Sequence, residues 1–128
     1  KRTGLRAPGE RSFGLLGEAE SCLHAMRGIV YSGLQSLDEQ VFSVGVTPSP
    51  AALTRTRGDA AFAAELARRV MDICADLYGS GTIYNANPFE QLIRDLVGLS
   101  AHMSTSRSNW VGLGRLSVDQ HNRRGERS

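Results

Sequence analysis

The sequence predicts an all-α fold, an up-down-up-down four-helix bundle. Apolar residues recur at spacings of three and four along two long segments and two shorter ones, which is the pattern of core-facing helices. Prolines and glycines interrupt the pattern between these segments and predict short loops. No stretch of useful length alternates in the manner of a strand. Long helices with apolar faces need partners of matching length, and a bundle supplies them.

The first helix is expected over residues 13–44. The polar residues 1–12 before it contain two glycines and a proline and are predicted to be a linker or entry segment, with Ser12 as a candidate cap. Its core-facing stripe is sustained for more than four heptads. The stripe consists of Leu16, Ala19, Leu23, Met26, Val30, Gly33, Leu37 and Val41.

Residues 44–52 contain two prolines that cannot continue a helix, so the chain is expected to turn there. Pro50 suits the first position of the next helix, with Ser49 as its cap. That second helix is predicted over residues 51–78. Its apolar stripe is formed by Phe62, Leu66, Val70, Ile73 and Leu77.

The start of this second helix is predicted to be weak because Gly58 lowers helix stability, and Asp59 is a candidate for restarting the helix. Small residues on the same segment permit close approach of a neighbouring helix. Tight packing within one subunit and an oligomer interface are both compatible with them. They are Ala60, Ala61, Ala63, Ala64 and Ala67.

Glycine-rich residues 79–81 end the second helix, as glycine just past a helix commonly does. Asn87 can cap the third helix and Pro88 suits its first position. This helix is expected over residues 88–105, with Arg94 and Asp95 between the apolar positions. The apolar face is Phe89, Leu92, Ile93, Leu96, Leu99 and Met103.

The fourth helix is expected over residues 108–118, with Trp110, Leu113 and Leu116 facing inward. The polar residues 119–128 are predicted to be a flexible tail. Residues 13–118 would then form one domain, as the length of 128 residues also indicates.

Composition excludes several classes of protein. The apolar fraction of 41% is that of a globular chain, and a formal charge of +2 does not favour nucleic acid as a partner. No run reaches the length of a transmembrane helix. Cys22 and Cys74 lie within apolar helical patterns and are interpreted as buried thiols of a cytoplasmic protein. Cys22 and His24 have no second ligand pair nearby, so no metal site is expected.

Residues 78–103 allow a more specific interpretation. Gly79-Ser80 at a turn is followed in order by Pro88, Glu90 and the pair Arg94-Asp95. This order resembles the C-terminal helical domain of the acyl-CoA dehydrogenase superfamily, where a helix ends at a Gly-Gly turn before a proline, an acidic residue and an Arg-Asp pair. The resemblance covers roughly residues 10–120.

The chain departs from the dehydrogenases at one catalytic position. Many of them carry a glutamate about two turns after the Arg-Asp pair, and this carboxylate removes the proton alpha to the thioester. Met103 stands here instead, with His102 before it, and a thioether cannot accept a proton. A histidine at this point resembles the two-component flavin-dependent monooxygenases, the type 2 branch of the superfamily.

This resemblance implies a C-terminal domain of a monooxygenase that uses reduced flavin, FMN or FAD, and O2 to hydroxylate a small organic substrate. His102 would be catalytic, and Gly79, Ser80, Gly81 and Arg94 would bind the cofactor. The implied partners are a flavin reductase and further copies of the chain in a dimer of dimers, with neither nucleic acid nor membrane. The missing N-terminal helical and middle β parts imply that this fragment alone is inactive.

Simpler interpretations remain open for each of these residues. His102 is compatible with a helix residue that has no chemical role, Arg94 with a structural anchor, and the glycines with a helix stop alone. For the whole protein, one alternative is an acyl-CoA dehydrogenase with its base elsewhere. The other is a helical assembly module without catalytic activity.

Overall fold

The computed structural model describes residues 9–43, 45, 47–78, 88–102 and 105–127. The elements are α1 (Glu10–Asp38), a short π-helical segment η1 (Glu39–Ser43), α2 (Pro50–Tyr78), α3 (Pro88–Ala101) and α4 (Asn109–Gly125). These residues form four α-helices and no strand, which confirms the predicted all-α four-helix fold. Within the same ranges, no helix combines the length and apolar character needed to cross a bilayer.

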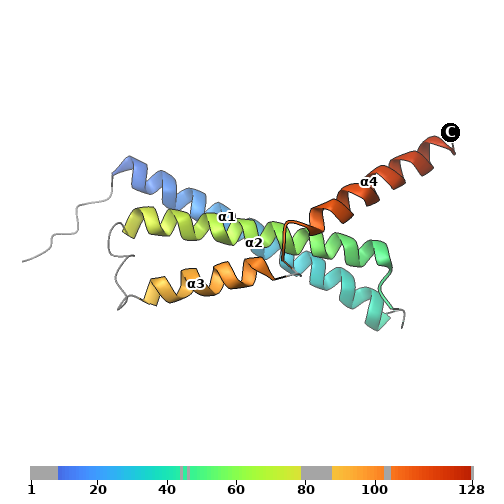
Figure 1. Ribbon diagram of the computed structural model, residues 1–128, viewed down its shortest axis with the longest axis horizontal. Coiled ribbons are helices and arrows are strands. Elements are labelled where there is room, and N and C mark those ends of the chain that lie inside the picture. Colours follow the sequence, from blue (N-terminus) through green and yellow to red (C-terminus); the bar gives the residue numbers. More distant parts are fainter. Residues whose placement is uncertain (1–8, 44, 46, 79–87, 103–104, 128) are drawn as a thin grey trace, which may run out of the picture.

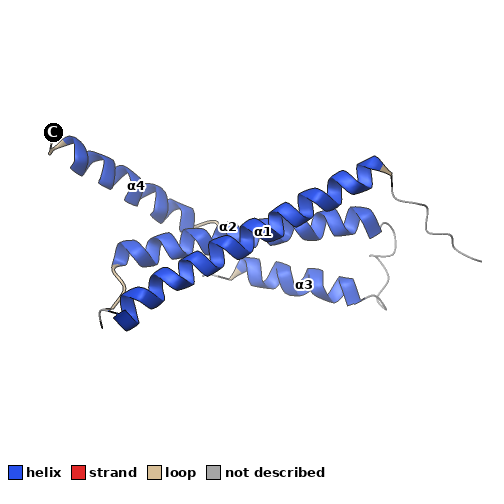
Figure 2. Ribbon diagram, turned by 180° about the vertical axis from the view of Figure 1, so that it is seen from behind, coloured by secondary structure: helices blue, strands red, loops and turns tan. Residues whose placement is uncertain are grey.

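Helix α2 is the centre of the arrangement. Each of the other three α-helices packs against α2, and within the described residues those three do not approach one another as closely. In Figures 1 and 2, α1 runs antiparallel along α2, while α3 lies beside its C-terminal half and α4 beside its N-terminal half. The alternating direction predicted for the bundle holds from α1 to α3. Helix α4 then runs in the general direction of α3 instead of turning back along it.

Ion pairs tie the two long helices together. Arg11 near the start of α1 donates to Asp76 near the end of α2 over 2.7 Å. One to two turns further along α1, Glu18 accepts two hydrogen bonds from the guanidinium of Arg69, over 2.7 and 3.0 Å. Two matched charges along an antiparallel pair fix its register, because sliding either helix by one turn would separate both pairs.

The helix boundaries largely follow the sequence prediction. Ser49 caps α2 as expected, because its Oγ accepts a hydrogen bond from the backbone N–H of Ala52 over 3.1 Å. Ser12, in contrast, was wrongly predicted as a cap. Helix α1 already begins at Glu10, and its N-cap is Gly9, which has no side chain to accept a bond. At the other end of the chain, α4 continues to Gly125, seven residues beyond the predicted end.

Gly58 does not interrupt α2, so the predicted restart at Asp59 is wrong. The helix is continuous from Pro50 to Tyr78, and Gly58 is buried within it. A Cβ at this position would lie 2.5 Å from Cδ2 of Leu113 in α4, and the indole N–H of Trp110 donates to the Gly58 carbonyl over 3.1 Å. Glycine therefore leaves room for the Leu113 side chain in its present position against α2, where a larger residue would force that side chain to shift.

The fully buried core is small and consists mainly of alanines. Ala61, Ala63 and Ala64 of α2 are buried against neighbouring helices, and Ile73 is the one large side chain that is wholly buried among the described residues. The apolar face predicted for α3 is only partly covered: Ile93 and Leu96 are half-buried, whereas Leu92 is 56% exposed and Leu99 is 59% exposed. Among the described helices, α3 packs on α2 and on no other, and this leaves part of its apolar side open.

Candidate functional site

His102 follows directly on the last residue of α3, and its side chain is exposed. Its backbone N–H donates to the carbonyl of Leu99 over 3.1 Å, and its own carbonyl accepts from the N–H of Thr105 over 3.0 Å. These two bonds hold the backbone of His102 in a turn. The imidazole is therefore presented at the surface from a hydrogen-bonded position, and it is not enclosed in apolar packing.

Two polar contacts with α2 secure the chain on either side of His102. Arg68 donates to the hydroxyl of Ser100 over 2.8 Å, and Ser100 is buried. Glu65 accepts two hydrogen bonds from the guanidinium of Arg107, over 2.7 and 2.6 Å. Glu65 and Arg68 are themselves an ion pair at 3.4 Å. One short network on α2 thus positions the residues before and after the candidate catalytic histidine.

The charges in this network support one another. The hydrogen bonds from Arg107 lower the pKa of Glu65 below its ordinary value of 4.5, with a smaller opposing effect of burial and further lowering by the charges of Arg107 and Arg68. The same contact raises the pKa of Arg107. The side chain of Glu65 is 20% exposed and that of Arg107 is 65% exposed, so water reaches the pair mainly from the side of Arg107. Both groups remain ionised at neutral pH.

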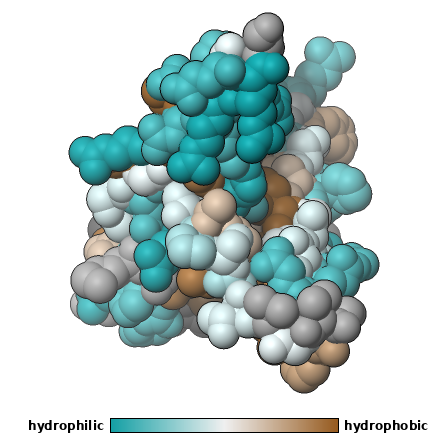
Figure 3. Space-filling view, turned by 90° about the vertical axis from the view of Figure 1, so that its right-hand side faces the viewer, coloured by the Kyte–Doolittle hydropathy of each residue, from teal (hydrophilic) through white to brown (hydrophobic). Residues whose placement is uncertain are grey.

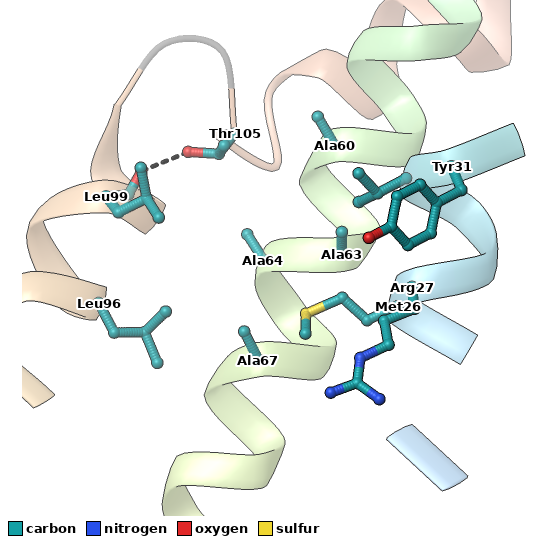
Figure 4. Close-up of a pocket in the computed structure, with 11 residues that line it drawn as sticks. Met26, Arg27, Tyr31, Ala60, Ala63, Ala64, Ala67, Leu96, Leu99 and Thr105 are labelled. Atoms are coloured by element: carbon teal, nitrogen blue, oxygen red, sulfur yellow. Dashed lines mark hydrogen bonds between the residues drawn. The ribbon is translucent and has the colours of Figure 1, made fainter. Parts of the chain in front are cut away.

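An apolar groove of about 360 Å³ opens beside this turn. In Figure 4, alanines of α2 form its floor, Met26, Arg27 and Tyr31 of α1 lie on one side, and Leu96 and Leu99 of α3 lie on the other. Thr105 lines the end of the groove and donates its hydroxyl to the carbonyl of Leu99. Leu99 and Thr105, three residues before and after His102, both line the groove, whereas His102 itself is not among the lining residues.

The alanines of α2 have two different roles. Ala61, which is 0% exposed, supports the packing within the bundle. Ala60 and Ala67 line the groove instead, on the same side of α2 as Ala63 and Ala64. Close helix packing thus accounts for only some of these small residues. The others leave space that larger side chains would fill.

Arg94 lies on an exposed part of α3, with 67% of its side chain accessible. It donates to the carboxylate of Glu90 over 2.6 Å within the helix, and Gln91 donates to the neighbouring Asp95 over 2.8 Å. These bonds are those of a solvated helix surface. Gly79, Ser80 and Gly81, the other predicted cofactor-binding residues, lie outside the described residues, as does Met103.

Sequence reasoning missed the α2 network that holds the histidine turn. Glu65 and Arg68 are spaced as an ordinary i, i+3 pair on a helix surface, a pattern that gives no indication of partners in α3 or after it. Arg107 falls between the predicted third and fourth helices and was not identified as a candidate residue. Chemically, the arrangement offers an exposed imidazole of fixed backbone position next to apolar space, which suits proton transfer or hydrogen bonding to a largely apolar ligand.

Comparison with known proteins identifies the family of the chain. Residues 14–107 match the family described as acyl-CoA dehydrogenase, C-terminal domain. No curated protein and no solved structure matches. The matched segment covers well over half of the chain and includes α1 to α3 and the histidine turn. The chain therefore belongs to the acyl-CoA dehydrogenase C-terminal domain family, a family of flavin-dependent oxidoreductases.

Proposed function

We propose that this chain is the C-terminal helical domain of a flavin-dependent monooxygenase, which hydroxylates a small organic substrate with O2 and reduced flavin from a partner reductase. The observation that carries the proposal is the exposed His102 in the segment between Leu99 and Thr105, two residues that line the apolar groove. Many dehydrogenases of the family use a carboxylate at the next position. That position is Met103, whose side chain cannot act as a base.

The chemistry of the residues fits a flavin site completed by other domains. A reduced flavin, when bound, supplies the electrons that activate O2. The flavin ring is largely apolar, and the groove beside His102 is lined mainly by alkyl groups, with Arg27 and Tyr31 on one side. His102 would donate or accept a hydrogen bond at the reacting edge and pass a proton near neutral pH. Gly79, Ser80, Gly81 and Arg94 are proposed to contact the cofactor from its other sides.

Substitution of His102 in the enzyme that carries this domain tests the proposal. We expect His102→Ala to lower the rate of substrate hydroxylation by at least about a hundredfold, because positioned acid–base groups contribute factors of that size. Reduced flavin is supplied chemically, and hydroxylated product and consumed O2 are measured together. The matched control is His24→Ala, which removes another exposed histidine, from α1, away from the groove lining.

Two results would contradict the monooxygenase. One is unchanged hydroxylation in His102→Ala with helix content and assembly intact. The other is oxidation of an acyl-CoA thioester without consumption of O2, which would identify a dehydrogenase with its base elsewhere.

A second role is supported by the uncovered surface of α3. Leu92, Val97 and Leu99 are each more than half exposed, although they are apolar. Exposed apolar side chains gathered on one helix are typical of interfaces. We propose that α3 takes part in the contacts of a homo-oligomer, a dimer of dimers. This assembly role is compatible with the monooxygenase, and it is also what a domain without catalytic activity would retain.

A further inference from the structure

The side of α4 that packs on α2 changes character along its length. Leu113 lies against Gly58, and one side of the helix continues through Leu116 to Gln120, whose Oε1 accepts a hydrogen bond from Arg55 of α2 over 2.9 Å. Arg123 and Arg124, three and four positions after Gln120, share that side of the helix. Arg127 follows just beyond the end of α4. Arginines therefore continue the packing side of α4 at its C-terminal end.

A hollow of about 260 Å³ lies where this side of α4 separates from α2. It is lined by Arg55, Gln120, Arg123, Arg124 and Arg127, with no carboxylate among them. The adjacent Asp119 lines a different hollow together with Trp110 and Arg115. Figure 3 faces this end of the molecule and shows a strongly hydrophilic surface in its upper part, where α4 lies. Four arginines, one from α2 and three from the C-terminal end of α4 and just beyond it, thus line one hollow.

Several arginines elsewhere in the described chain form ion pairs between elements. Arg11, Arg69 and Arg107 each pair with a carboxylate of another element at 2.7 Å or less. Within the described residues, Arg55 and Arg123 have no such ion pair. The dipole of α4 favours cations in its last turn, but that does not account for Arg55, which comes from the N-terminal half of α2. Like charges three and four residues apart oppose each other, and a bound anion would remove that repulsion.

We propose that this hollow binds a phosphate or diphosphate group of a small ligand. The planar guanidinium forks of Arg55, Arg123 and Arg127 match the oxygens of such a group, and Gln120 holds Arg55 in position to take part. The volume is too small for a complete drug-sized ligand and suits a compact anionic group. The proposal does not depend on the monooxygenase activity, since it concerns the end of α2 away from His102.

Titration of the isotope-labelled full chain tests the site. Inorganic phosphate and pyrophosphate are added at constant pH and ionic strength, and the Nε–H resonances of the arginines are followed by NMR. We expect saturable shifts at Arg55 and Arg123. Arg55→Gln and Arg127→Gln should each weaken binding about tenfold, the size expected for one charge-assisted hydrogen bond. The matched control Arg57→Gln removes a charge two residues from Arg55 outside the hollow and should leave the Kd unchanged.

Shifts that rise linearly with phosphate, or that appear equally at Arg11 and Arg69, would overturn the proposal. So would equal weakening by Arg57→Gln. Arg127→Gln keeps the test valid if Arg55→Gln unfolds the chain, because Arg127 lies beyond the end of α4 and is not a partner of Gln120. Titrations with FMN and riboflavin distinguish the two sources of the phosphate group. If FMN binds more tightly than inorganic phosphate and riboflavin does not bind, the ligand is a flavin phosphate. If FMN and inorganic phosphate bind with equal affinity, the ligand is free phosphate.

Discussion

Helices α2 and α3 both have an apolar side, but their surroundings are very different. Helix α2 is covered along its length by α1, with α3 and α4 on its two halves, and it contains most of the fully buried residues of the described chain. Helix α3 touches α2 alone, and Leu92, Val97 and Leu99 are more than half exposed. The comparison indicates that the packing around α2 is satisfied within this chain. Helix α3, in contrast, presents surface that is available to other domains or copies.

The largest effect is expected at Ile73, in α2. Replacing its 1% exposed side chain by alanine leaves a cavity, so Ile73→Ala should lower the free energy of unfolding by about 2–5 kcal/mol. Leu92→Gln in α3 changes a side chain that is already 56% exposed and should alter stability by less than about 0.5 kcal/mol. Urea denaturation followed by circular dichroism measures both.

The same variants test the assembly role of α3. Light scattering on the enzyme that carries this domain should show that Leu92→Gln weakens the oligomer while the fold is kept. A large loss of monomer stability in Leu92→Gln would instead show that α3 is part of the core, and the distinction between the two helices would not hold.

The contact between α2 and α4 provides the next test. Gly58→Val introduces a branched side chain whose Cβ would lie 2.5 Å from Cδ2 of Leu113. We expect this overpacking to lower the free energy of unfolding by about 1–3 kcal/mol. Gly28→Val is the matched control, since a Cβ there meets nothing within 4 Å. Thermal unfolding of both variants measures the difference.

A double substitution identifies the cause of this loss. If the steric contact is responsible, Leu113→Ala should remove much of the cost of Gly58→Val. Equal destabilisation by Gly28→Val, or no relief in the double variant, would point to the propensity of valine in helices instead.

The smallest effect concerns the pH dependence of the Glu65–Arg107 pair. The pKa of Glu65 is lowered in the folded chain, so its contribution to stability is fully present above its ordinary pKa of 4.5. That contribution is lost as the pH falls through the lowered value, because the unfolded chain then binds the proton more readily. The Tm difference between the wild type and Glu65→Gln should therefore shrink below pH 4.5.

Glu20→Gln, on an exposed part of α1, serves as the comparison for this measurement. A Tm difference for Glu65→Gln that stays constant down to the lowest pH at which the chain is folded would show that the pair does not stabilise the turn.

Much of the fold could be predicted from the sequence because its signals are local. Periodicity located all four helices, and the serine before Pro50 identified the cap of α2. Gly58 was interpreted as a weak point because the interpretation considered only α2 itself. The residue that favours glycine at this position is Leu113, more than fifty residues away in the sequence. Helix propensity describes one helix by itself and therefore gives no indication of such a partner.

The candidate site was predictable to a smaller extent. The predicted third helix extended to residue 105 and therefore included His102, whereas α3 ends at Ala101 and leaves His102 exposed just beyond it. The groove beside it depends on residues of three helices, and the tethers at Ser100 and Arg107 depend on α2. The arginines of α4 were taken for part of a polar tail, because the helix there lacks an apolar stripe.

The two anchors on α2 have a mechanical consequence for any reaction at His102. Ser100 and Arg107 are fastened to neighbouring residues of one rigid helix, Arg68 and Glu65, so the histidine cannot travel as the tip of a hinged flap. In the proposed reaction, the substrate would therefore be brought to the imidazole instead of being covered by a moving segment that carries it. The same two contacts would transmit a small shift of α2 to the backbone around His102.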